Sequence, residues 1–228
     1  MNWREEAKKR VALEAVKHVK NGFVVGLGSG STAAYVIEEI GRLMRQDGLQ
    51  VFGVPSSSQA MLLAVGSGIP LTTLDEHPVL DLAIDGADEV DKKLDMIKGG
   101  GGALTREKIV ASAAKQVVIV ADETKLVEKL GSFKVPVEVL PFALTTTTAK
   151  IMELGGKPLL RESKGKVGAV VTDNGNYIVD VDFGPIDNAE EMNKMLKIIP
   201  GVIETGLFIG LADIVYLGKK DGIIRLEK

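Results

Sequence analysis

Hydrophobic residues in the first 120 positions follow two spacings, one typical of helices and one typical of buried strands. Ala7, Val11, Ala15 and Val19 recur at the helical spacing. Similar patterns predict helices at 33–45, 57–66 and 105–115, whereas short continuous apolar runs predict strands at 23–27, 50–54, 80–85 and 116–120. Because such strands alternate with helices, we expect a Rossmann-like, mostly parallel sheet with helices on both faces.

The pattern changes after position 133, where polar and apolar residues alternate over shorter stretches. It predicts an edge strand at 135–140, helices at 145–154 and 190–198, a hairpin at 169–180 turning at Asp173-Asn174-Gly175, and a strand at 202–208. This order is typical of a small split βαβ, ferredoxin-like α+β domain. We therefore expect one domain at 1–131 and 206–228, to which the run 212–217 returns, and an inserted domain at 132–205.

Composition narrows the class of protein. The chain has 228 residues, of which 45% are hydrophobic, so it can bury a sizeable core. Its net charge of −3 lacks the basic excess of nucleic-acid-binding proteins. The chain has no cysteine, which excludes disulfides, thiolate zinc sites and cysteine nucleophiles. A charged helix is expected at residues 1–9 in place of a signal peptide, and no apolar run is long enough for a membrane span, so we expect a cytoplasmic protein.

Three polar loops follow predicted strands, at 28–32, 85–91 and 122–125. In a parallel sheet these loops share the carboxyl edge, where ligands bind. Glycines in 26–32 expose N–H groups, and Ser31 or Thr32 can cap the next helix, so we expect phosphate there. The loop is neither a dinucleotide fingerprint, because Ser31 replaces the third glycine, nor a P-loop, because no lysine precedes Ser31. A plain glycine-rich turn remains an alternative.

The acidic loop and the glycine run behind it hold the candidate chemistry. Asp85 and Asp88 follow a buried strand and suit sugar hydroxyls, although turn formation or magnesium binding would also explain them. Lys98 precedes four glycines, 99–102, whose amides can approach a ligand closely. We expect Thr105 to cap a helix that carries Glu107 in its first turn. That glutamate is either a surface residue or, beside an oxyanion-binding loop, a base acting next to a carbonyl.

Only two histidines occur, His18 in the first helical pattern and His77 beside Pro78. Neither histidine belongs to a recognisable catalytic or metal-binding pattern in the sequence, so both are expected to be surface or packing residues.

These segments resemble the A-type ribose-5-phosphate isomerase family. The resemblance is collinear over nearly the whole chain, and its most specific parts are the acidic loop and the run Lys98–Lys108. The supporting segments are 26–34, 136–139, 171–176 and 199–202. Two departures are mild, since Ser29 and Ser56 stand where the family commonly has threonine. Both keep a hydroxyl group.

The resemblance implies the activity and the residue roles. It implies interconversion of D-ribose 5-phosphate and D-ribulose 5-phosphate through an enediolate, without a metal or other cofactor. Glu107 would shuttle the proton between C1 and C2, Asp85 and Asp88 would assist ring opening, and Lys98 would stabilise the enediolate oxygen. The remaining substrate-binding residues would be Ser29, Gly30, Ser31, Thr32, Gly86, Ala87, Gly99, Gly100, Gly101, Lys125 and Lys8.

Two other classes of function stay open. A non-catalytic sugar-phosphate sensor would use the same loops but should carry an effector segment. An amino-sugar-phosphate deaminase or lactonase of a related fold would be expected to use a histidine, and neither histidine lies in a candidate loop. The apolar small domain favours a homodimer or homotetramer, with a sugar phosphate as ligand and no nucleic acid or membrane as partner.

Overall fold

The computed structural model describes residues 3–163, 165 and 167–228, which form two compact units. The first unit comprises the chain up to Ala87, Arg106–Leu126 and Gly210–Lys228, and the second comprises Asp88–Thr105 and Val127–Ile209. Asp88–Thr105 thus packs within the second unit, although the sequence pattern groups it with the first. The domain boundaries inferred from sequence, 1–131 with 206–228 against 132–205, remain a prediction.

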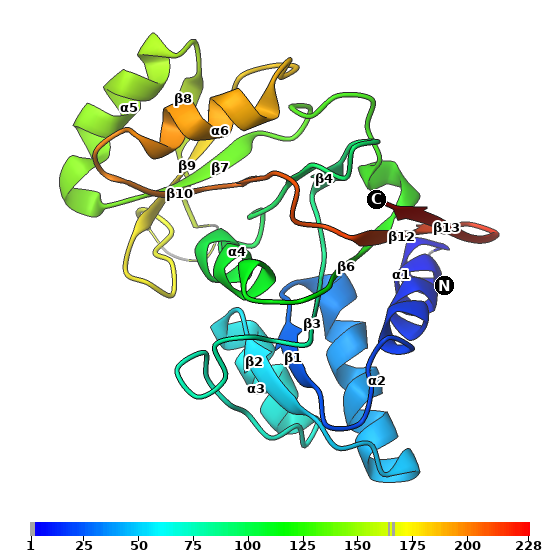
Figure 1. Ribbon diagram of the computed structural model, residues 1–228. Coiled ribbons are helices and arrows are strands. Elements are labelled where there is room, and N and C mark those ends of the chain that lie inside the picture. The colour runs from blue at the N-terminus through cyan, green and yellow to red at the C-terminus, as the bar shows by residue number, and fades with distance from the viewer. Residues whose placement is uncertain (1–2, 164, 166) are drawn as a thin grey trace. The chain divides into compact units, whose positions relative to one another are not determined.

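The first unit is built on a six-stranded sheet in the order β13-β12-β6-β3-β1-β2 (Figure 1). All neighbours are parallel except β12 and β13, which form an antiparallel pair at the C-terminus. The strands are β1 (Val24–Leu27), β2 (Phe52–Pro55), β3 (Leu82–Asp85), β6 (Val117–Asp122), β12 (Ile214–Lys219) and β13 (Gly222–Glu227). The predicted Rossmann-like sheet is therefore confirmed.

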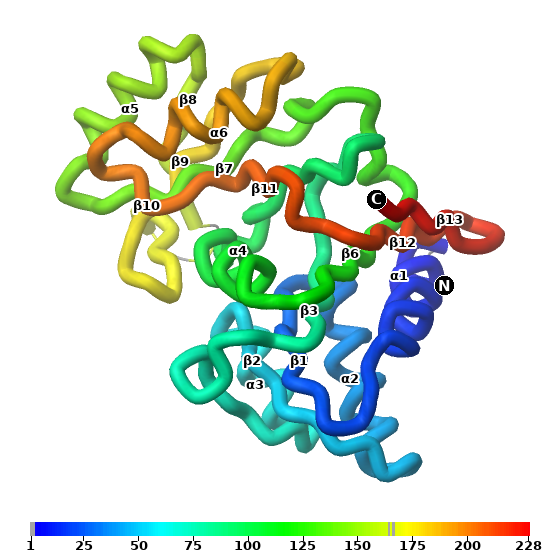
Figure 2. Tube along the Cα trace, viewed as in Figure 1, coloured from blue at the N-terminus to red at the C-terminus, as the bar shows by residue number. Residues whose placement is uncertain are grey.

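Helices cover both faces of this sheet, which explains why its central strands β1, β3 and β6 are buried throughout. On one face, α1 (Trp3–Val16), α2 (Ser31–Asp47) and α3 (Ser58–Gly66) pack their buried residues against β1, β3 and β6. The path of the chain in Figure 2 brings α1 beside β12, with which it makes extensive contact. On the other face, α4 (Leu104–Ser112) packs Val110 against Gly26, where a Cβ atom would collide with the valine. Met1 and Asn2, part of the predicted N-terminal helix, lie outside the described residues.

The second unit contains a four-stranded antiparallel sheet in the order β10-β7-β9-β8. Its elements are β7 (Val135–Val139), α5 (Leu144–Glu153), β8 (Lys157–Leu160), β9 (Tyr177–Asp182), α6 (Ala189–Lys197) and β10 (Val202–Thr205). The βαββαβ order is the predicted one, but the strand that pairs with β9 is β8 at 157–160 and not the residues just before Asp173. Short strands β4 (Glu89–Val90), β5 (Met96–Ile97) and β11 (Leu207–Phe208) form a separate sheet. Two 3-10 turns, η1 (Glu123–Lys125) in the first unit and η2 (Pro141–Ala143) in the second, complete the fold.

The structure corrects the expectation that 135–140 is an edge strand, because β7 lies between β10 and β9. Pro136 is tolerated there because its pairing with β10 has already ended, at Thr205 opposite Val137. The carbonyl of Pro136 accepts a hydrogen bond from the N–H of Gly206 at 2.6 Å, so the missing N–H also faces that side. Pairing with β9 is undisturbed.

Within the described part of the chain, every helix is too short or too polar to cross a bilayer.

Candidate active site

The loop between β1 and α2 is shaped by the carboxylate of Asp85. This side chain is 6% exposed, and its Oδ1 accepts hydrogen bonds from the N–H groups of Ser29 at 3.0 Å and Gly86 at 2.7 Å. A Cβ atom at Gly28 would collide with the same carboxylate. Asp85 therefore holds the loops after β1 and β3 together, and glycine at position 28 is what allows this approach.

The glycine loop leads directly into the N-terminus of α2. Ser31 is the first helical residue, and Gly30, with φ +91°, occupies the cap position without a side-chain hydrogen bond. The expectation that Ser31 or Thr32 caps this helix is therefore wrong. The N–H of Gly30 donates to Oε1 of Gln59 at 2.9 Å. Free helix N-termini attract anions through their N–H groups and the helix dipole. The predicted phosphate loop has the backbone arrangement that such a ligand needs.

Lys8 places a cation at this helix end. Its Nζ donates to Oγ of Ser31 at 3.0 Å and to Oε1 of Glu5 at 2.8 Å. The hydroxyl of Tyr35 also donates to Glu5, at 2.8 Å. The hydrogen bond from Lys8 has the largest effect in lowering the pKa of Glu5, and the hydrogen bond from Tyr35 has the next largest. The lysine is thereby oriented by a carboxylate that stays ionised.

Hydroxyl groups from a second loop support Ser29. Its Oγ lies 2.6 Å from Oγ of Ser57 and 2.9 Å from Oγ of Ser56. Ser57 also caps α3 by accepting a hydrogen bond from the N–H of Ala60 at 3.1 Å. Sequence analysis did not include Ser56, Ser57 or Gln59 among the site residues. The available signal was their position directly after β2, at the same sheet edge as the glycine loop.

The third loop of this edge follows β6. Asp122 Oδ1 accepts a hydrogen bond from the N–H of Thr124 at 3.1 Å, which forms the turn that carries the half-buried Lys125. An added Cβ atom on Gly86 would lie 3.7 Å from the carbonyl oxygen of Val120 and 3.9 Å from that of Ser29. The carboxyl ends of β1, β3 and β6, neighbours in the sheet, therefore bring the three predicted loops together.

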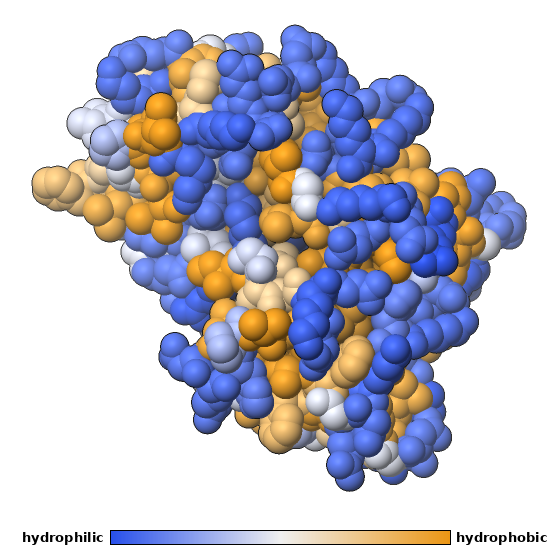
Figure 3. Space-filling model, in the orientation of Figure 1, coloured by the Kyte–Doolittle hydropathy of each residue, from blue (hydrophilic) through white to orange (hydrophobic). Residues whose placement is uncertain are grey.

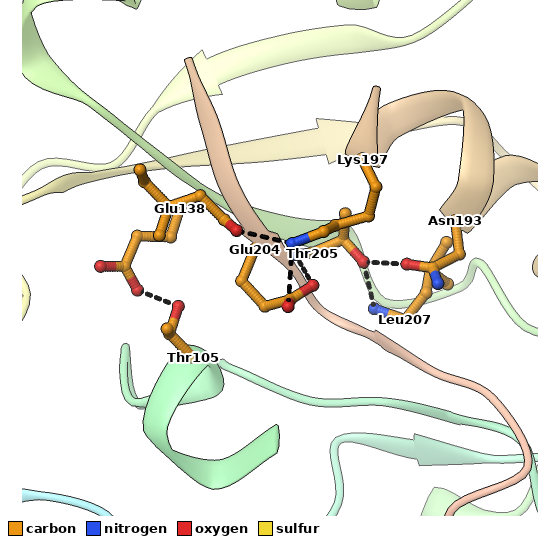
Figure 4. A network of polar contacts seen from close by, with 8 residues as sticks. Thr105, Glu138, Asn193, Lys197, Glu204, Thr205 and Leu207 are labelled. Carbon is orange, nitrogen blue, oxygen red and sulfur yellow. Dashed lines mark hydrogen bonds and ion pairs between the residues drawn. The ribbon is translucent and has the colours of Figure 1, made fainter. Parts of the chain in front are cut away.

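Glu107 is the fourth residue of α4 and its side chain is buried, with 5% exposure. This burial rules out the alternative of an exposed surface glutamate. The expected capping role of Thr105 is also wrong, because α4 begins at Leu104 and Thr105 lies inside the helix. The hydroxyl of Thr105 donates to the carboxylate of Glu138 on β7 (Figure 4). The helix start is thus held by a residue that sequence analysis did not select.

Asp88, Lys98 and the glycine run belong to the second unit. Oδ2 of Asp88 accepts a hydrogen bond from the N–H of Gly100 at 2.7 Å. Lys98 is 3% exposed, and its Nζ lies 5.3 Å from the ring centroid of Phe208. Gly99 and Gly102 have φ values of +106° and +84°, which residues with a Cβ atom rarely adopt. The run is therefore a fixed turn that only glycine can form at these two positions.

Arg161 contacts this loop and was not selected by sequence analysis. Its Nη1 donates to the carbonyl oxygens of Gly99 at 2.9 Å and Gly100 at 3.1 Å, and Asp180 binds the other side of the guanidinium. No motif around position 161 signals this contact, because it depends on the register of β8 and β9.

Both histidines contact aromatic side chains, and the ring centroid of His77 lies 6.0 Å from that of Phe52. His18 Nε2 lies 2.9 Å from the hydroxyl of Tyr216, which agrees with the expected packing role. Among residues 3–163, 165 and 167–228, no group of three or more His, Asp or Glu side chains is arranged to hold a metal ion.

Comparisons with known proteins agree on one family. The family described as ribose 5-phosphate isomerase A (phosphoriboisomerase A) matches residues 52–222. The ribose-5-phosphate isomerase A of Methanothermobacter thermautotrophicus is 52% identical over 95% of both chains, and that of Methanosarcina acetivorans is 51% identical over 96% of this chain and 93% of its own.

Solved structures give the same result. The ribose 5-phosphate isomerase A of Methanocaldococcus jannaschii is similar with a TM-score of 0.95 and 49% identity, covering 98% of this chain and 99% of its own. A D-ribose-5-phosphate isomerase in complex with phospho-erythronic acid has a TM-score of 0.97 and 44% identity, covering both chains completely. The sequence motifs, the fold and these relatives together show that the chain belongs to the ribose 5-phosphate isomerase A family.

Proposed function

We propose that this protein is an aldose-ketose isomerase that interconverts D-ribose 5-phosphate and D-ribulose 5-phosphate without a cofactor. The observation that carries the proposal is the buried carboxylate of Glu107 in the first turn of α4, the helix that directly follows the glycine run. Family membership over nearly the whole chain supports it.

In the proposed reaction, Glu107 is the acid/base. Asp85 and Asp88 assist ring opening. The carboxylate of Glu107 then removes the proton from C2 of the open-chain aldose, and the electron pair moves onto the carbonyl oxygen at C1. The resulting enediolate is stabilised by Lys98 and the amides of Gly99 and Gly101, while the amide of Gly100 holds Asp88. Protonated Glu107 then returns the proton to C1, while the O2 proton transfers to O1, giving the ketose. A positioned base of this kind contributes about a hundred- to ten-thousandfold to the rate.

The substrate phosphate is proposed to bind at the N-terminus of α2. Lys8 and Ser31 already meet there at 3.0 Å, beside the N–H groups of the glycine loop. Ser29, Gly30, Thr32, Gly86, Ala87 and Lys125 complete the proposed substrate-binding set. Anchoring the phosphate, which lies far from C1 and C2, holds the reacting carbons at fixed positions relative to the base.

The ligand of one similar structure fits this chemistry. Phospho-erythronic acid carries a phosphate at one end and a planar carboxylate at the other, so it imitates both the anchor and the planar, anionic enediolate. We therefore expect it to inhibit this protein competitively, because transition-state-like ligands bind more tightly than substrates.

The proposed setting of the enzyme is the cytoplasm, where it acts on a small sugar phosphate as a homodimer or homotetramer, without nucleic-acid or membrane partners. The net charge of −3 supports the absence of a nucleic-acid partner.

The direct test is to incubate purified protein, treated with a chelator, with ribose 5-phosphate and measure ketose formation. The proposal predicts turnover that does not depend on added metal. Saturable binding without turnover would identify a sensor, and ammonia release from an amino-sugar phosphate would identify a deaminase. Either result would contradict the proposal.

A further inference from the structure

The two faces of the sheet in the second unit have different roles. Residues on β7 and β9 alternate between them, and Val137, Val179 and Val181 pack in the core with Ile151 of α5 and Leu196 of α6. The opposite face therefore carries the intervening residues of these strands, namely Pro136, Glu138, Ile178 and Asp180.

The segment from Lys98 to Thr105 lies on this second face. A Cβ atom at Gly99 would come within 3.3 Å of Cβ of Pro136, and one at Gly102 within 3.2 Å of Cδ1 of Ile178. Thr105 donates to Glu138 at the end of the segment. The glycine run is thus supported by the sheet along its length, which gives the sheet a direct influence on the conformation of the loop.

Arg161 makes a charged contact between the sheet and the loop. It follows β8, and its N–H donates to the carbonyl oxygen of Ile178 at 2.8 Å, which continues the pairing with β9. Its guanidinium binds Asp180 through two parallel hydrogen bonds, from Nε at 2.8 Å and from Nη2 at 2.5 Å. The side chains of Arg161 and Asp180 are only 15% and 20% exposed. This geometry leaves Nη1 directed at the carbonyl oxygens of Gly99 and Gly100.

These two carbonyl groups belong to the peptide units that carry the N–H groups of Gly100 and Gly101. Because a peptide unit is planar, fixing its carbonyl oxygen also fixes the direction of its N–H. A cationic donor on the carbonyl also polarises the peptide unit and strengthens its N–H as a donor. The N–H of Gly100 donates to Oδ2 of Asp88 at 2.7 Å, so through the first peptide unit Arg161 fixes this contact with Asp88. Through the second it fixes the direction of the Gly101 amide, which is assigned to the enediolate.

We propose that Arg161, held by Asp180, is a positioning residue for the isomerisation: it fixes the Gly99–Gly100 peptide unit, whose N–H holds Asp88, and orients the Gly100–Gly101 peptide unit so that the amide of Gly101 stabilises the enediolate. The inference rests on the proposed function. It assigns Arg161 an effect on turnover and not on phosphate binding, because its contacts are with the loop and not with the anion site at α2.

The test is Arg161→Lys, which keeps the positive charge but loses the planar fork that binds Asp180 and the loop together. The matched control is Arg42→Lys, because Arg42 binds Glu39 in α2 through the same two-bond geometry, at 2.9 and 2.7 Å. Steady-state kinetics with ribose 5-phosphate and thermal unfolding are measured for both variants and for the wild type.

We expect Arg161→Lys to lower kcat about ten- to one-hundredfold with KM within about threefold, since misoriented oxyanion donors affect the transition state. Arg42→Lys should change either constant by less than about twofold. Asp180→Asn should lower kcat in the same direction, and its effect should shrink in the Arg161→Lys background, as expected of residues acting as a unit.

A kcat for Arg161→Lys equal to that of the control, with an active wild type, would overturn this inference and leave the proposed function intact. A rise in KM alone, or full additivity of the two substitutions, would also overturn it. A wild type that does not isomerise ribose 5-phosphate would overturn the proposed function and this inference with it.

Discussion

The proposed phosphate site includes Ser31 at the start of α2 and Lys125 in η1. Ser31→Ala and Lys125→Ala would each remove one proposed contact to the anion, and hydrogen bonds to charged groups are worth about 1.5–3 kcal/mol. We expect each substitution to raise KM about tenfold or more while kcat changes little. Inorganic phosphate should also inhibit both variants less strongly than the wild type.

The control for this experiment is Lys150→Ala, which removes a surface lysine paired with Glu153 on α5. It should leave KM and phosphate inhibition unchanged. If phosphate inhibits both Ser31→Ala and Lys125→Ala as strongly as the wild type, the proposed anchor is wrong.

Residues within a local motif could be selected from the sequence, whereas residues that act across strands could not. The burial of Glu107 agrees with the role expected from its motif, and the contact of Asp85 with Ser29 agrees with the expected meeting of the loops at the sheet edge. Arg161 and Glu138 had no such signal, because their partners are set by strand register and by the path of the chain between elements. The capping role of Thr105 was wrong for the same reason: the helix starts one residue earlier and the hydroxyl binds Glu138.

At the scale of elements, Glu138 joins the start of α4 to the turn before β9. Its carboxylate is fully buried and accepts hydrogen bonds from Thr105, from Thr172 at 2.8 Å, from Asn174 at 3.1 Å and from Asn176 at 2.8 Å. Glu138→Ala would leave the buried donors of Thr172 and Asn176 without this acceptor, so we expect a loss of about 3 kcal/mol or more in the free energy of unfolding.

Urea denaturation followed by circular dichroism measures this loss. Glu190→Ala is the control, because that glutamate forms an exposed pair with Lys194 and should contribute less than about 1 kcal/mol. Equal midpoints for the two variants would show that Glu138 does not hold the elements together.

His18 links the end of α1 to β12 and makes the stability of the first unit depend on pH. Burial, and next the charge of Arg225, lower the pKa of His18 below its usual value near 6.5. The unfolded state therefore binds a proton more tightly than the folded state, so the free energy of unfolding falls as pH decreases below about 6.5. His18→Gln, which does not titrate, should make the urea midpoint less dependent on pH between about 7.5 and 5.

Comparison of the wild-type and His18→Gln midpoints at the two pH values checks this expectation. An identical change in both proteins would show that other groups cause the acid sensitivity.

Most elements could be predicted from hydrophobic periodicity, since buried strands and amphipathic helices differ in their spacing. The predicted hairpin was right about its turn, where the N–H of Gly175 donates to Thr172 at 2.9 Å, but before the turn only Val171 pairs with Tyr177. The interior position of β7 and the terminal strand β13 could not be predicted. Strand order depends on contacts between distant segments, and local spacing does not encode it.

At the scale of the whole molecule, exposed apolar residues of the second unit support the proposed homo-oligomer. Phe142 is 97% exposed and Ile198 80% exposed, and Leu140 and Ile203 add to the same region. The N–H of Leu140 donates to the carbonyl oxygen of Gly201 at 2.8 Å, so the two segments are adjacent. Figure 3 shows hydrophobic surface over the segment between β7 and α5. Apolar patches of this kind mark protein interfaces.

Phe142→Asp should therefore shift the molar mass measured by light scattering toward that of one chain. Val65→Asp, which alters an exposed apolar residue on α3 of the first unit, is the control and should leave the mass unchanged. An unchanged mass for Phe142→Asp would contradict the proposed interface.

The turnover of Glu107→Gln shows whether the buried carboxylate of this residue moves the proton. This substitution keeps the size of the side chain but removes the carboxylate that is assigned to move the proton, and Glu190→Gln changes a first-turn glutamate of α6 in the same way. We expect Glu107→Gln to lower kcat for ribose 5-phosphate by about a hundredfold or more with little change in KM, while Glu190→Gln behaves as the wild type. A Glu107→Gln variant with near wild-type kcat would contradict this assignment.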